Sequence, residues 1–150
     1  MTTAQREELK NGGVRFSTKE ASIVIYRPRP GVVLMIIAGA DRGEFGTAPH
    51  AELDDDIRKF APCEMFMDLT GASLAALSVQ KSWTEWLSQR RPWLKTVNIL
   101  VAGKYVHVTV EIAKLFSRTG ELIRIYTDAS AFDGALDRTA TGASALRQNT

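Results

Sequence analysis

The chain has 150 residues, of which 45% are hydrophobic and 24% are charged, a composition that suits one globular domain with a substantial core. Lysine and arginine total 19 against 17 acidic residues, and the net charge of +2 is too small to attract nucleic acid or anionic lipid from a distance. The single cysteine, Cys63, excludes an intramolecular disulfide, and no apolar run reaches the ~20 residues of a transmembrane helix. We therefore expect a cytoplasmic protein that binds neither nucleic acid nor membrane.

The two ends of the chain have few apolar residues. Residues 1–19 are polar and charged and contain an Asn-Gly-Gly break, and residues 139–150 carry one large apolar side chain. Such segments bury too little surface to offset the entropy of ordering them. We expect a poorly ordered N-terminal tail over 1–19, a folded body over 20–138 and a flexible C-terminal tail over 139–150.

Strand and helix patterns alternate within this body. Apolar runs over residues 22–26 and 32–38, joined by a Pro-Gly turn, predict two antiparallel strands. The later patterns predict, in chain order, a helix over 53–60, a strand over 63–69, a Trp-rich helix over 78–91, a strand over 96–101, a strand over 122–126 and a helix capped by Asp128.

One segment carries two patterns. Residues 106–112 alternate as a half-buried strand does, but over 106–120 the polar side chains fall on one helical stripe that ends near Gly120. We predict a helix, which gives the order β-β-α-β-α-β-α-β-α. Strands separated by helices run parallel, so the predicted fold class is α/β, with a mixed, mostly parallel five-stranded sheet and about four helices.

The end of the third predicted strand carries the most informative residues. Asp68, Leu69 and Thr70 close that strand, and Ser78 opens the next helix. Free backbone N–H groups and the helix dipole favour an anion or a phosphate at such a place. Two interpretations of Ser78 remain open: an N-cap that accepts a hydrogen bond from the first turn, or a regulatory hydroxyl.

The element order and the third strand, Met-Phe-Met-Asp-Leu-Thr-Gly over residues 65–71, resemble the STAS domain. This is the fold of bacterial anti-sigma-factor antagonists and of stressosome and sulfate-transporter modules, and the resemblance covers nearly all of residues 20–138. In the family a segment like Asp-Ser-Ser-Gly follows the strand, and its second serine is phosphorylated. That serine corresponds to Ser78, while positions 76, 77 and 79 depart from the motif, so the resemblance implies a degraded phosphorylation site.

The resemblance implies a non-catalytic regulatory module that binds a protein: an anti-sigma-factor-like or kinase-like partner, a scaffold subunit, or a second copy of the chain. Two alternatives remain open: an assembly subunit that has lost phosphorylation, and a small-ligand or lipid carrier with a pocket between helix and sheet. The expected binding surface consists of Asp68, Thr70, Ser73, Ser78, Lys81, Trp86 and Arg90.

No residue pattern predicts catalysis, a cofactor or a metal site. Neither histidine has a metal ligand at a specific spacing, and Cys63 starts a buried strand, where cysteine is usually inert. Asp54, Asp55 and Asp56 point in different directions on a helix, which indicates a solvated acidic face. The glycine-rich segment 39–46 lacks the lysine of a P-loop.

Three tryptophans, Trp83, Trp86 and Trp93, lie on or beside the helix that starts at Ser78. They either fill the core or form a binding face. In the second case Arg90 and Arg91 would complete an aromatic and basic patch for an acidic protein partner.

Overall fold

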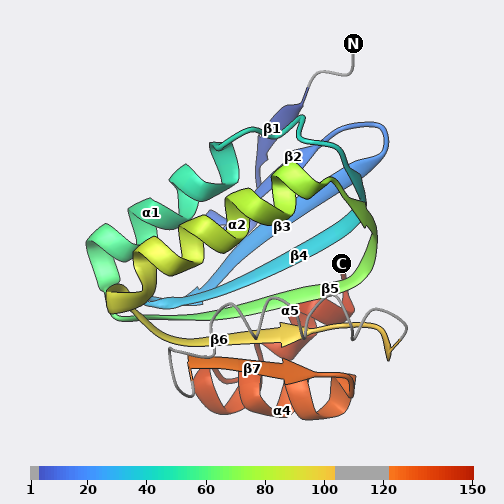
Figure 1. The fold of residues 1–150 in the computed structure, drawn as a ribbon. Helices are drawn as coiled ribbons and strands as arrows, with labels where there is room; N and C mark the ends of the chain where they lie inside the picture. The colour runs from blue at the N-terminus through green and yellow to red at the C-terminus, as the bar shows by residue number, and fades with distance from the viewer. Residues whose placement is uncertain (1–3, 104–121) are drawn as a thin grey trace.

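The computed structural model describes residues 4–103 and 122–150. Its elements are β1 (Gln5–Glu8), the short 3-10 helix η1 (Lys10–Gly12), β2 (Val14–Ser17), β3 (Ala21–Arg29), β4 (Val32–Asp41), α1 (Ala48–Phe60), β5 (Cys63–Ala75), α2 (Leu77–Arg90), η2 (Arg91–Trp93), β6 (Leu94–Leu100), β7 (Ile123–Tyr126), α4 (Ala129–Thr139) and α5 (Ser144–Gln148). The strands form one sheet in chain order, with α1 and α2 on one face and α4 and α5 on the other (Figure 1).

The predicted α/β class is confirmed, but the predicted sheet is wrong in strand number and direction. The described residues form seven strands, and β1 to β4 pair antiparallel whereas β4 to β7 pair parallel. The sheet is therefore mixed and not mostly parallel. The sequence does not predict β1 because its four residues are all polar and exposed, so they show no apolar alternation. Such a composition is common for an edge strand.

The N-terminal residues differ from the expected tail over 1–19. Residues 5–8 and 14–17 are strands, and Val14 and Phe16 are buried opposite Ile25 and Ile23 of β3. The Asn-Gly-Gly break belongs to the connection of a β-hairpin, where Gly12 adopts a positive φ of 80°. The folded body therefore begins well before residue 20.

The C-terminal residues also differ from expectation. Asp128 caps α4 as predicted, since its carboxylate accepts a hydrogen bond from Ser130 N at 2.9 Å. Beyond α4, Ala140 and Ala143 are buried and α5 follows, within the stretch 139–150 that we expected to be flexible. The predicted helix over 106–120 lies outside the described residues. No described helix is long and apolar enough to cross a membrane.

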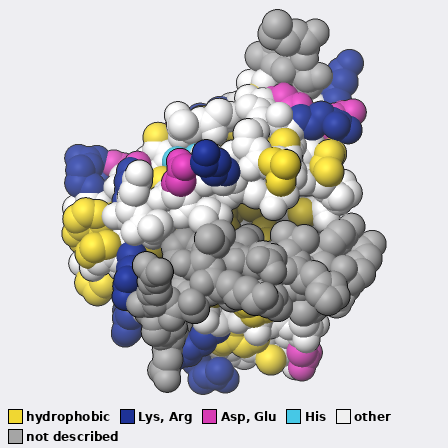
Figure 2. Space-filling view, in the orientation of Figure 1, with side chains coloured by type: hydrophobic (Ala, Val, Ile, Leu, Met, Phe, Trp, Pro, Cys, Tyr) yellow, Lys and Arg dark blue, Asp and Glu magenta, His cyan; other side chains and the backbone are white. Residues whose placement is uncertain are grey.

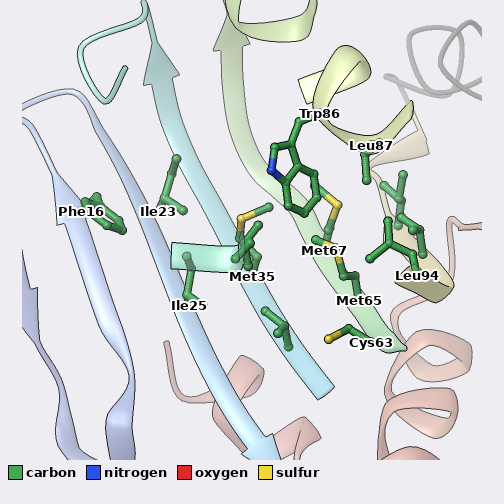
Figure 3. Close-up of a cluster of buried hydrophobic side chains, with 14 of the residues drawn as sticks. Phe16, Ile23, Ile25, Met35, Cys63, Met65, Met67, Trp86, Leu87 and Leu94 are labelled. Carbon is green, nitrogen blue, oxygen red and sulfur yellow. The ribbon is translucent and has the colours of Figure 1, made fainter. Parts of the chain in front are cut away.

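Two hydrophobic clusters hold the layers together. The larger one lies between the sheet and α1 and α2, where Phe16, Ile23, Met35, Met67 and Trp86 point into one layer (Figure 3). The smaller one lies between the sheet and α4, and is built around Leu34, Phe66, Phe132 and Leu136. Both faces of the central strands are therefore buried, as is typical of strands covered by helices on each side.

The end of β4 depends on a glycine. Gly39 has a φ of 80°, and a Cβ built there would lie 2.0 Å from the carbonyl oxygen of Glu20. The pairing of β4 with β5 shifts register on both sides of this region, between Ile36 and Ala38 and between Gly39 and Ala40. Only glycine combines this backbone conformation with this close approach, so Gly39 sets the path of the chain toward Asp41.

The burial of Phe16 distinguishes the observed β2 from a disordered tail. Phe16→Ala should lower the free energy of unfolding by about 3–5 kcal/mol, because the side chain is 3% exposed and its loss leaves a cavity. Phe60→Ala is the matched control: Phe60 is 42% exposed and its loss should cost far less. Urea unfolding of both variants measures the difference, and equal stabilities would mean that residues 14–17 do not pack on the sheet.

Candidate functional site

Ser78 lies in the first turn of α2, and its side chain is exposed. The helix N-cap is Ala76, whose carbonyl accepts hydrogen bonds from Val79 N at 2.9 Å and Gln80 N at 3.0 Å. The N-cap interpretation of Ser78 is therefore wrong, because the capping position is two residues earlier and holds no side-chain oxygen. Ser78 is available at the surface, next to the positive end of the helix dipole.

Two exposed apolar side chains come just before Ser78 in the chain. We call residues 73–78 the β5–α2 junction: they contain the end of β5, the N-cap and the first two residues of α2. Leu77 is 83% exposed and Leu74 is 45% exposed. Hydrophobic side chains are visible at the surface over this end of α2 (Figure 2). Large exposed apolar groups of this kind are the surface feature to consider for a protein contact.

Asp68 is not part of this junction. β5 continues to Ala75, so Asp68 lies within the strand and its buried side chain belongs to the face covered by α4 and α5. Its Oδ1 accepts hydrogen bonds from Thr70 N at 2.9 Å and Thr70 Oγ1 at 2.6 Å, and its Oδ2 accepts one from Arg147 Nη1 at 3.3 Å. The expected proximity of Asp68 to the start of α2 is therefore wrong.

Arg147 of α5 joins Asp68 to Asp133 of α4. Its Nε and Nη2 each donate to the Asp133 carboxylate at 2.6 Å, which is a bidentate pair, and Gln148 Nε2 donates to the same carboxylate at 3.1 Å. The hydrogen bonds from Arg147 hold the pKa of Asp133 below its ordinary value, and Asp133 in turn raises the pKa of Arg147. Asp68 thus takes part in holding the C-terminal helix α5.

Trp86 and Arg90 connect the two helices of the other face. Asp54 of α1 accepts hydrogen bonds from Trp86 Nε1 at 3.0 Å and from Arg90 Nε and Nη2 at 2.7 and 3.0 Å. Burial opposes the ionisation of Asp54, but the bonds from Arg90 and Trp86 outweigh it and hold the pKa of Asp54 below its ordinary value. The core interpretation therefore holds for Trp86, and Arg90 is engaged in a structural ion pair.

The remaining predicted surface residues stay exposed. Thr70, Ser73 and Lys81 are exposed, and Lys81 Nζ lies 4.0 Å from Glu85 Oε1 of the next helical turn. Of the expected binding surface, the structure therefore leaves Ser73, Ser78 and Lys81 beside the start of α2. It assigns Asp68, Trp86 and Arg90 to contacts between elements.

His50 of α1 is a buried residue beside Ser78 that the sequence did not single out. Its ring stacks on Trp83 with centroids 4.0 Å apart, and its Nε2 lies 3.3 Å from Ser82 Oγ. Burial lowers the pKa of His50, and its Nδ1 has no hydrogen-bond partner among the described residues. A pocket of about 220 Å³ lies between His50 and Ser78, at the N-terminal ends of α1 and α2.

The other residues weighed for chemistry have structural roles. Cys63 is buried, its Sγ donates to Asp56 O at 3.6 Å, and burial raises the pKa of the thiol. The predicted solvated acidic face of α1 is wrong for Asp56, which is buried and pairs with Arg27 at 2.8 Å. Within the described residues, no three acidic, histidine or cysteine side chains form a group that could hold a metal ion.

A second, larger pocket lies between α2 and the sheet. It has a volume of about 280 Å³ and extends over the ends of β4, β5 and β6. Its walls are mostly apolar, and the buried residue Asp41, which also lines the smaller pocket, is among its lining residues. We call it the apolar pocket; hydrophobic side chains are visible in a hollow beside α2 (Figure 2).

The fold is similar to that of a known regulatory protein. The crystal structure of an anti-sigma factor antagonist from Mycobacterium paratuberculosis matches with a TM-score of 0.52, over 86% of this chain and 97% of that chain. The sequences are 11% identical, so the similarity concerns the fold, and the expected STAS-like fold is confirmed. No family model matches the chain, and no curated protein matches it in sequence.

Replacing Arg147 should show that the C-terminal helix stabilises the body. Arg147→Gln leaves the buried carboxylates of Asp68 and Asp133 without their cation, and we expect a loss of about 3 kcal/mol in the free energy of unfolding. Arg138→Gln is the matched control, because Arg138 is an exposed arginine of α4. Thermal and urea unfolding measure both variants; similar stabilities would contradict the proposed role of Arg147.

The same ion pair predicts an acid-dependent loss of stability. The pKa of Asp133 is lowered in the folded state, so its contribution is complete above the unfolded value of about 3.9 and is lost as the pH falls through the folded pKa. The free energy of unfolding should therefore fall more steeply below about pH 4 in the wild type than in Asp133→Asn. Urea unfolding at several pH values gives the two slopes. Equal slopes would show that Asp133 has the same pKa in both states.

Proposed function

We propose that the chain is a non-catalytic regulatory module that binds a protein partner through the β5–α2 junction. The observation that carries this proposal is the exposure of Leu77 and Leu74 on either side of the N-cap, in the surface next to Ser78. Exposed leucines give a partner apolar area to bury, and a few well-packed side chains carry most of the affinity of an interface. The STAS-like fold supports the regulatory role by analogy.

The partner class follows from the same analogy. The similar structure is an anti-sigma factor antagonist, and we propose for this chain an anti-sigma-factor-like or kinase-like partner, or a scaffold subunit, in the cytoplasm. Arg90 and Trp86 are excluded from this proposed surface because Asp54 engages both of them. The proposed contact is therefore mainly apolar, with Lys81 as the nearby cation on the next turn of α2.

We further propose that phosphate on Ser78 weakens this contact. A phosphate at the start of α2 is compatible with the helix, because the dipole and free N–H groups favour negative charge there. It would nevertheless add a charge of about −2 beside Leu77. A partner that buries the leucine would then also have to desolvate the phosphate. Lys81 lies three residues after Ser78 on the helix and offers the phosphate a cation in the free protein.

An assembly subunit without phosphorylation is the second candidate. It is favoured by the residues that surround Ser78, since Ala76, Leu77 and Val79 replace the other residues of the family motif. In this case the junction would bind a scaffold or a second copy of the chain, and the hydroxyl of Ser78 would be incidental.

Affinity measurements on junction variants separate these candidates. A photo-crosslinking amino acid at position 77 identifies the partner in native cells, and calorimetry then compares wild type, Leu77→Ser, Ser78→Ala and Ser78→Asp. We expect Leu77→Ser and Ser78→Asp to weaken binding by about tenfold or more, and Ser78→Ala to bind like wild type.

Trp93→Ser is the control, because Trp93 is 48% exposed in η2 and not in the junction. Loss of binding in Leu77→Ser alone, with Ser78→Asp equal to wild type, would eliminate the switch and leave the assembly subunit. Unchanged affinity in all variants would rule out the junction as the contact surface. Light scattering of wild type and Leu77→Ser reports whether the partner is a second copy.

A further inference from the structure

The apolar pocket has the dimensions and walls of a small-molecule site. Its volume of about 280 Å³ is near the lower end of ligand pockets, which begin at roughly 300 Å³. Three strands and α2 contribute large apolar side chains to its lining, among them Ile37, Met67, Leu69, Ile99, Trp83 and Leu87. Replacing water with an apolar molecule against these walls would lower the free energy, because it removes apolar surface from water.

Asp41 gives this apolar site one charge. It is the ionisable side chain among the described residues of the lining, and it is 5% exposed. Its Oδ1 accepts a hydrogen bond from Gly43 N at 2.9 Å, and no described residue donates to Oδ2. The described residues thus satisfy one of the two carboxylate oxygens, and Oδ2 remains able to accept from a donor or a cation. Burial accordingly raises the pKa of Asp41.

Gln80 also lines the apolar pocket and adds a second acceptor. Its Nε2 donates to Ala75 O at 2.8 Å, which leaves its Oε1 to accept, and Ala76 N donates to Asp41 O at 2.9 Å. The side chain of Gln80 and the backbone carbonyl of Asp41 therefore both bond to the dipeptide Ala75-Ala76, which lies just before α2. The polar end of the pocket offers acceptors and negative charge, while the described lining contains no lysine, arginine or histidine.

We propose that the apolar pocket binds a small apolar primary amine. The alkyl or aryl body lies against the side chains of the sheet and α2, and the ammonium group donates to Asp41 and Gln80. An anion would meet the carboxylate of Asp41 without a compensating cation. A neutral hydrocarbon would leave that carboxylate without a cation. An apolar amine matches both the apolar lining and the negative charge of Asp41. This inference does not depend on the protein partner proposed for the junction.

A series of probes that differ in one group tests this inference. Calorimetry compares octylamine, 1-octanol and octanoate with the wild-type protein, and methyl NMR follows Met67, Leu87 and Ile99 during each titration. We expect octylamine to bind with a Kd below about 1 mM and at least about tenfold more tightly than octanoate, with shifts at these three methyl-bearing side chains. Equal affinities for the amine and the carboxylate, or no shifts at these side chains, would overturn the proposal.

Two variants and a control locate the binding. Asp41→Asn keeps an Oδ1 acceptor for Gly43 N and should lose about tenfold in affinity for octylamine while 1-octanol binds as before. Ala72→Phe places a ring in the pocket and should abolish binding of both. Glu44→Gln, which removes a nearby carboxylate outside the described lining, should bind octylamine like wild type. Unchanged octylamine binding in Asp41→Asn, with wild-type-like folding, would refute the role of the carboxylate.

Discussion

The burial of β5 on both faces is the constraint on which the rest of the structure depends. Successive side chains of a strand point to opposite sides, so Met65 and Met67 enter the cluster under α1 and α2, and Phe66 enters the cluster under α4. Asp68 follows Phe66 to the second face, where a carboxylate needs a cation. Arg147 supplies it at 3.3 Å, so the alternation of β5 also determines where α5 packs.

Periodicity predicts the elements whose apolar pattern is strong, and their lengths only where that pattern continues. The predicted third strand stops at Leu69, since the residues after it are mostly small and polar. β5 nevertheless continues through Gly71 to Ala75, because its backbone pairs with β4, from Ala38 opposite Gly71 to Asp41 opposite Ala75. Backbone pairing of this kind requires no apolar side chain. The wholly polar β1 pairs with β2 in the same way. The sequence pattern therefore predicts that Asp68 lies near the end of its strand, whereas the strand ends seven residues later, at Ala75.

The candidate site is predictable only in part for a related reason. The helix start near Ser78 follows from the Trp-rich pattern. The sequence does not show, however, whether a given leucine lies at the surface or in the core. The exposure of Leu77 depends on how the elements pack around it, and packing is not visible in the local sequence. The pairing of Asp54 with Arg90 likewise joins two helices that are distant in sequence. Charge partners of this kind appear only when the helices are placed side by side.

The β5–α2 junction and the apolar pocket share one turn of helix. Leu77 and Ser78 present their side chains outside, whereas Val79 and Gln80 of the same turn line the pocket. An occupant that moves this turn would alter the junction, and a partner bound at the junction would alter the pocket by the same coupling free energy, since linkage is reciprocal. The hydrogen bond from Gln80 to Ala75 O ties the wall of the pocket to the last residue of β5, which belongs to the junction.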